Sequence, residues 1–168
     1  MHEESPDPFD SLSRRKRTHP TSTDKRVTPQ ERDLLWFQKI HGHGPLSSSY
    51  LHAFSKHLRR NEKRAKDRLT DLFNESRTPH DGTYLTRPSQ QFRTLDSRYN
   101  DLVYDLTDAA NAALKERGLW QDTATGRAGP WLHGFMVSCI TASIELATLD
   151  RDDIRYIPQA EILARAGT

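Results

Sequence analysis

Residues 59–74, RRNEKRAKDRLTDLFN, have the apolar spacing of an amphipathic α-helix. Ala65, Leu69, Leu72 and Phe73 fall at i, i+4, i+7 and i+8, which places them on one face. The basic residues gather in the first half of this helix, whereas Asp71 comes late. Because the helix dipole favours acids at a helix start and bases at its end, the reversed distribution suggests an anionic ligand at the N-terminal end.

DNA recognition helices present their N-terminal part to base edges and phosphates. We therefore expect a set of polar side chains on this helix to bind DNA: Arg59 and Arg60 at phosphates, Lys66 beside them, and Lys63, Arg64, Asp67 and Thr70 at bases. The alternative is a solvated basic helix face, which a charge run alone would favour.

Composition limits the classes of protein that fit. The 168 residues are 34% hydrophobic with a mean hydropathy of −0.85, so part of the chain is expected to be unpacked. The net charge of +2 excludes a histone-like polycation. A single cysteine, Cys139, excludes an internal disulfide framework. There is neither an apolar run of about 20 residues nor a secretory signal, so we expect a cytoplasmic protein without a membrane partner.

Three regions are expected. Residues 1–27 read as a disordered basic tail containing Arg14-Arg15-Lys16-Arg17. Residues 28–118 read as the folded domain, which begins with a helix capped by Thr28. A second short helix then begins near Ser48 and Ser49, whose hydroxyls and amides suit a phosphate. Residues 119–168 read as a helix–strand–helix extension.

Two strands follow the basic helix, at residues 83–87 and 102–106. The second runs into Thr107-Asp108, which we expect to cap a helix over residues 109–117. Three helices followed by such a hairpin predict a winged helix-turn-helix, mainly α with a small β wing (α+β). The hairpin loop is too long for a simple turn. Its polar residues are suited to a groove or to phosphates, and we include these in the DNA-binding set: Arg87, Gln90, Gln91, Arg93 and Arg98. Alternatively the loop folds back on the core through Phe92, Leu95 and Tyr99.

The run Val103-Tyr104-Asp105-Leu106-Thr107 before a helix resembles the second wing strand of many winged-helix regulators. With residues 51–73 and 84–87 it is similar to the replication-relaxation family, winged helix-turn-helix proteins of bacterial plasmids and phages. The resemblance implies DNA binding linked to replication or transfer of a mobile element, or to its transcription, in a bacterial protein associated with the nucleoid. It also implies recognition-helix roles for Arg60, Lys63, Arg64 and Asp67, and wing roles for Arg87 and Arg98.

The C-terminal region opens with a strongly periodic helix at Trp131 and continues with a strand at residues 154–157 and a last helix after Pro158. These elements cannot bury their own apolar faces, so they pack on the domain or on a second copy. The expected dimer interface comprises Leu132, Phe135, Met136, Ile140 and Ile144.

Sequence-preferring binding of double-stranded DNA is the leading function, with helix 60–74 in the major groove and the wing at 84–106. A winged helix that binds a regulator or replication protein is the alternative. We expect no enzyme, because no nucleophile elbow and no acid–lysine constellation for a nuclease is present. We expect neither a cofactor nor a metal, since His41 and His43 lack further ligands at suitable spacing.

Overall fold

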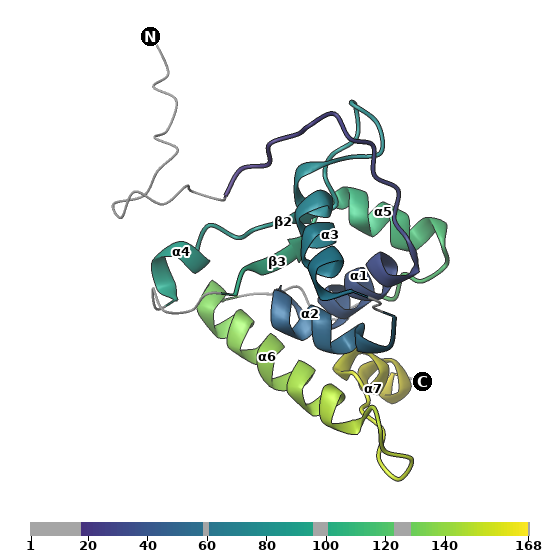
Figure 1. Ribbon diagram of the computed structural model, residues 1–168. Coiled ribbons are helices and arrows are strands. Elements are labelled where there is room, and N and C mark those ends of the chain that lie inside the picture. The colour runs from purple at the N-terminus through teal and green to yellow at the C-terminus, as the bar shows by residue number, and fades with distance from the viewer. Residues whose placement is uncertain (1–17, 59–60, 96–100, 123–128, 168) are drawn as a thin grey trace.

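The computed structural model describes residues 18–58, 61–95, 101–122 and 129–167. They form a mainly helical α+β structure with a small three-stranded antiparallel sheet. The elements in chain order are α1 (Glu31–His43), β1 (Leu46–Ser47), α2 (Ser48–Phe54), the 3-10 turn η1 (Lys56–Leu58), α3 (Glu62–Asn74), β2 (Leu85–Thr86), α4 (Gln91–Thr94), β3 (Val103–Leu106), α5 (Asp108–Glu116), α6 (Trp131–Thr148) and α7 (Gln159–Ala166) (Figure 1). None of these helices combines the length and apolar character needed to cross a membrane.

Helix α1 supplies the largest side chains of the core. Trp36, Phe37 and Ile40 are fully buried, and the indole Nε1 of Trp36 donates to Leu51 O at 2.8 Å. The expected cap at Thr28 is wrong. The helix instead begins after Gln30, whose backbone amide donates a hydrogen bond to the carboxylate of Asp33 at 2.8 Å. An acid at the third helical position satisfies an amide that the helix itself cannot pair.

The sheet is centred on β3, which pairs with β1 on one side and β2 on the other. The registers Leu85↔Leu106 and Leu46↔Tyr104 define the two antiparallel ladders. The β2–β3 pair was expected, whereas β1 is too short for its two residues to show any alternation in the sequence. Thr107 then caps α5 by accepting the amide of Ala110, as the sequence predicts.

Residues 21–27 form a strap along the C-terminal end of α3. The Val27 amide donates to Ser76 O at 3.0 Å, and Lys25 forms an ion pair with Asp71 at 2.5 Å. Figure 1 shows this segment passing over α3 before it reaches α1. The expectation of disorder up to residue 27 therefore fails for residues 18–27. The basic run 14–17 lies outside the described residues.

Helix α6 packs on α1 and α2 through a polar contact. Lys39 and His43 of α1 both bind the carboxylate of Glu145, and His43 Nε2 lies 2.5 Å from Glu145 Oε2. Burial alone would raise the pKa of Glu145, but hydrogen bonds from His43 and Lys39 outweigh it, and the pKa lies below its ordinary value. The carboxylate is thus charged and holds α6 against the domain.

The strand expected at residues 154–157 does not form. Ile154 and Ile157 are both exposed, in a segment that pairs with no strand in the described part of the chain. A β-rich composition cannot form a strand without a partner for its backbone groups. The C-terminal region is therefore a helix, a connecting segment and the helix α7.

Candidate nucleic-acid interface

Helix α3 begins at Glu62 and is capped by Asn61. The side-chain oxygen of Asn61 accepts the amide of Arg64 at 3.1 Å. The four residues predicted to face the core are all buried, at 0–2% exposed: Ala65, Leu69, Leu72 and Phe73. Arg59 and Arg60 precede the cap and lie outside the described residues, so their predicted phosphate contacts stay predictions.

The opposite face of α3 is exposed along its length. The predicted residues on it are Lys63, Arg64, Lys66, Asp67 and Thr70, and each is exposed. Lys66 forms an ion pair with Glu62 at 3.5 Å, in which both side chains are about two-thirds exposed. Such surface pairs contribute little and exchange readily for another anion. No side-chain hydrogen bond or ion pair ties Lys63, Arg64 or Asp67 to another described residue.

Arg68 anchors the middle of α3 to the start of α1. Its Nε lies 3.0 Å from Asp33 Oδ2, its NH2 group lies 2.6 Å from the same oxygen, and NH2 also donates to Thr28 O. Asp33 is completely buried. A guanidinium that donates two hydrogen bonds to one carboxylate fixes both distance and angle. This contact therefore sets the orientation of α3 relative to the rest of the domain.

Glu75 anchors the C-terminal end of α3 to the strap. Its carboxylate, which is 3% exposed, accepts hydrogen bonds from the hydroxyls of Ser22 and Thr23 at 2.7 Å each and from the Thr23 amide at 2.9 Å. Burial would raise the pKa of Glu75, but these hydrogen bonds outweigh it and the pKa is lowered. The exposed face of α3 is thus presented by a helix held at its middle and at one end.

The start of α2 offers less to a phosphate than expected. The Ser48 amide donates to Leu102 O at 2.9 Å, so it is occupied within the domain. Ser49 is exposed, and its hydroxyl lies 2.8 Å from that of the buried Ser47. Of the two predicted serines, only Ser49 presents its side chain fully to solvent.

The loop between β2 and β3 carries the short helix α4, which projects to one side of the α1–α3 unit (Figure 1). Gln90 and Arg93 are exposed there, as a DNA contact requires. Phe92 is 47% exposed, so it does not pin the loop to the core. Arg98 and Tyr99 lie outside the described residues.

Two predicted wing contacts are wrong. Arg87 is 7% exposed: its guanidinium lies 3.9 Å from the ring centre of Phe73, and its NH2 group donates to the Tyr104 hydroxyl at 3.1 Å. Gln91 is 5% exposed: its amide accepts Val103 N at 2.8 Å and donates to Val103 O at 3.0 Å. Both residues build the base of the loop and cannot reach DNA.

The dimer residues predicted on α6 divide into two groups. Leu132, Met136, Ile140 and Ile144 are 37–58% exposed, whereas Phe135 is 5% exposed and stacks on Trp131 at 5.2 Å. Phe135 is therefore part of the fold of this chain and not of an interface. The error arose because residues 135 and 136 are neighbours in sequence but point to different faces of the helix.

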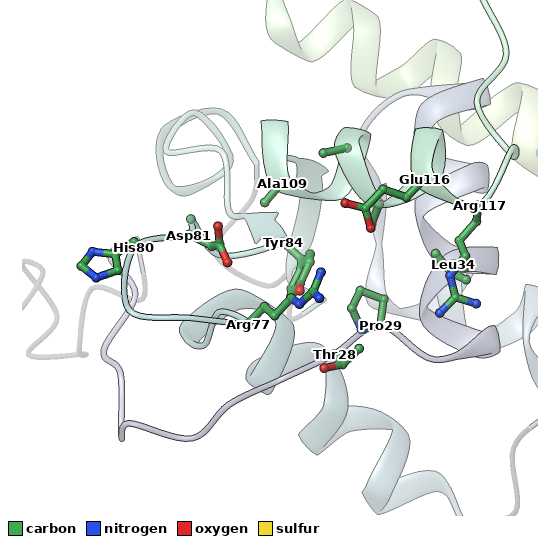
Figure 2. Close-up of a pocket in the computed structure, with 13 residues that line it drawn as sticks. Thr28, Pro29, Leu34, Arg77, His80, Asp81, Tyr84, Ala109, Glu116 and Arg117 are labelled. Carbon is green, nitrogen blue, oxygen red and sulfur yellow. The ribbon is translucent and has the colours of Figure 1, made fainter.

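A hollow of about 460 Å³ lies between the N-terminal end of α1, α5 and the loop 77–82. Figure 2 shows Arg77 on one side of it, Glu116 of α5 and the following Arg117 opposite, and Asp81 in the loop. Charges of both signs surround it, and none of the predicted site residues lines it. Among the described residues no group of three or more His, Cys, Asp or Glu side chains is placed to hold a metal ion.

Comparison with protein-family models, with curated proteins and with solved structures gave no match for this chain. The similarity to the replication-relaxation family therefore stays a prediction from its motifs.

Sequence reasoning missed the two anchors of α3. Arg68 lies three residues after Ala65 and one before Leu69, which places it on the buried face, and this spacing could have identified it. No local signal marks the contact of Asp33 with Arg68 or that of Glu75 with the strap, because these partners lie at least 35 residues apart in the sequence.

Proposed function

We propose that this protein binds double-stranded DNA through α3, as a winged helix-turn-helix protein that prefers particular sequences. Helices α1, α2 and α3 followed by the β2–β3 pair have the element order of that fold. In the proposed complex α3 enters the major groove and the α4 loop reaches the neighbouring backbone. The role is control of transcription, replication or transfer of a mobile element.

The observation that carries this proposal is the exposed face of α3. Lys63 and Arg64 lie in the first turns of the helix, and their exposed side chains form no hydrogen bond or ion pair with another described residue. Ordering long basic side chains on DNA binding costs less conformational entropy when the backbone that carries them is already fixed. The anchors at Asp33–Arg68 and at Glu75 supply that fixation.

Asp67 supports sequence preference over general affinity. It is exposed on the same face, one turn after Lys63. A carboxylate repels phosphate, but it accepts a hydrogen bond from cytosine N4 in the major groove. In a protein that bound only the phosphate backbone, an acidic residue at this position would not increase DNA affinity.

We also propose that two copies act on one DNA site. A dimer places two recognition helices on half-sites about 34–36 Å apart, one helical turn of DNA. Ser49, Gln90 and Arg93 are the remaining exposed contacts that we assign to the phosphate backbone.

The test is selection of preferred duplexes from a random library, followed by fluorescence anisotropy at two salt concentrations. We expect an enriched sequence, and a loss of roughly 10³–10⁵ in affinity from 50 to 200 mM salt if six to ten phosphates are contacted. Arg64→Ala should weaken binding to the enriched site by about 1–3 kcal/mol. Arg117→Ala, which removes an exposed arginine directly after α5, is the matched control and should leave affinity unchanged.

Absence of enrichment combined with equal affinities of the Arg64→Ala and Arg117→Ala proteins would refute the proposal. These results would favour the alternative that the sequence leaves open, in which the winged helix binds a protein partner. Asp67→Asn adds a second test: it should change base preference at one position of the site without lowering the salt dependence.

A further inference from the structure

Large exposed apolar side chains gather in one part of the molecule. Of the eleven found among the described residues, all but Phe92 lie between residues 132 and 163: Leu132, Met136, Val137, Ile140, Ile144, Leu149, Ile154, Ile157, Ile162 and Leu163. Scattered exposed apolar residues are normal, but such a concentration marks an interaction surface.

Helix α6 has two different faces. Its inner face carries Ser138, whose hydroxyl donates to His43 O at 2.8 Å, and Glu145, which binds Lys39 and His43. Glu145 is the only Asp, Glu, Lys or Arg residue of α6, so the outer face has no formal charge. We call the outer residues Leu132, Met136, Val137, Ile140 and Ile144 the α6 outer face.

The α6 outer face continues onto α7. Val137 of α6 and Leu163 of α7 line one groove of about 580 Å³, together with Tyr156 and Pro158 of the connecting segment. The α6 outer face and α7 therefore meet at this groove, through Val137 and Leu163.

The parts of this sequence outside the described residues have little to cover that surface. Residues 1–17 contain only Met1, Phe9 and Leu12 as large apolar residues, residues 96–100 contain only Tyr99, and residues 59–60, 123–128 and 168 contain none. Ten half-exposed side chains need a partner with comparable apolar area.

We propose that a second copy of this chain docks on the α6 outer face and its continuation on α7. The ten side chains are on average about half exposed, which leaves on the order of 500 Å² of apolar surface in solvent. A standard interface buries about 800 Å² per partner, about 65% of it apolar in homodimers, so the need is roughly 520 Å². The exposed apolar area is therefore of the order that a homodimer interface needs.

The absence of charge favours a second copy over a different protein. In a two-fold contact each residue meets the same surface of its partner, so any charge near the axis would face its own image. The α6 outer face avoids this penalty. Ile140 is the most exposed of its residues, at 58%, and lies at the middle of the 18-residue helix, so a two-fold axis near Ile140 gives the largest overlap.

The test is the molar mass of the full chain, measured without DNA by light scattering or sedimentation across two decades of micromolar concentration. We expect a dimer for the native protein and a monomer for Ile140→Asp. Phe92→Asp is the matched control, because Phe92 is the one large exposed apolar residue outside this region, and it should stay dimeric. Circular dichroism should show that both variants keep the native helix content, since both positions are exposed.

Cross-linking gives an independent measurement. In a Cys139→Ser background, Ile140→Cys should yield a disulfide-linked dimer under mild oxidation, and Phe92→Cys should not. A native protein that is monomeric throughout would overturn the proposal, as would a dimer that survives Ile140→Asp and fails to cross-link through position 140. Because no DNA is present, these outcomes are separate from the failure of DNA binding.

Discussion

Replacing Arg68 with alanine tests whether the ion pair with Asp33 fixes helix α3. The change removes the guanidinium that donates at 3.0 Å and 2.6 Å to a carboxylate with no exposure to solvent. It also removes the hydrogen bond to Thr28 O at 2.8 Å. Asp33 keeps its contact with the Gln30 amide but loses its only salt bridge among the described residues.

The magnitude follows from the burial of the two groups. Removing one partner of a buried pair costs about 3–5 kcal/mol, because the other charge is left without compensation. The side chain of Arg68 is 14% exposed, which allows water to reach Asp33 in the variant and places the expected loss near the lower limit. For a chain of this size the corresponding shift in Tm is roughly 6–12 °C.

Urea denaturation followed by circular dichroism measures the loss in free energy of unfolding. The control is Arg64→Ala, the same substitution one turn earlier on the exposed face of α3. Both substitutions replace arginine with alanine in the same helix, so they change helix propensity equally. The difference between the two variants in free energy of unfolding therefore reports the loss of the Arg68 contacts. We expect Arg64→Ala to change the free energy of unfolding by less than about 0.5 kcal/mol. The combination of Arg68→Ala with Asp33→Asn should lose much less than the sum of the two single changes.

Equal stability of the Arg68→Ala and Arg64→Ala proteins would refute this reasoning. So would additive losses in the double variant, because additivity means that the two side chains do not interact.

Three further substitutions address the base of the loop and the contact with α6. Arg87→Ala should destabilise the protein by about 1–2 kcal/mol through lost cation–π contact, with DNA affinity unchanged once the folded fraction is matched in anisotropy. Gln91→Ala should cost about 1–3 kcal/mol in thermal or urea unfolding because it leaves a buried backbone amide unpaired; a loss below 0.3 kcal/mol would contradict this. Glu145→Gln should be less stable than the native protein at neutral pH. Since the folded pKa of Glu145 is lowered, its stabilisation is present above the unfolded pKa of about 4.3 and is lost as the pH falls through the folded value. The gap between the two proteins in urea unfolding should therefore shrink from pH 7 to pH 3, and a constant gap would contradict the assignment.

The apolar pattern of the sequence predicted much of the fold. The stripe Ala65, Leu69, Leu72 and Phe73 is buried as expected, and the β2–β3 pair and the cap at Thr107 are confirmed. These features depend on residues close together in the chain, where helix and strand periodicity are informative.

Buried polar residues were the main source of error. Arg87 and Gln91 look like surface residues, and their structural role depends on Tyr104 and Val103, which lie 17 and 12 residues further along the chain. Periodicity contains no information about such pairs. The exposure of Lys63, Arg64 and Asp67 agrees with the sequence, whereas their contact with DNA stays a proposal.

The strap has a consequence for biosynthesis. Residues 21–27 are synthesised before α3, but their hydrogen-bond partners are at residues 74–76, about 50 residues later. At about 5–20 residues per second the ribosome needs roughly 3–10 s to add them, and during that time the strap has no docking site. The strap is therefore synthesised before α3 but is among the last parts of the domain to be protected from proteases. Limited proteolysis of stalled nascent chains should cleave near residue 24 until α3 has been synthesised.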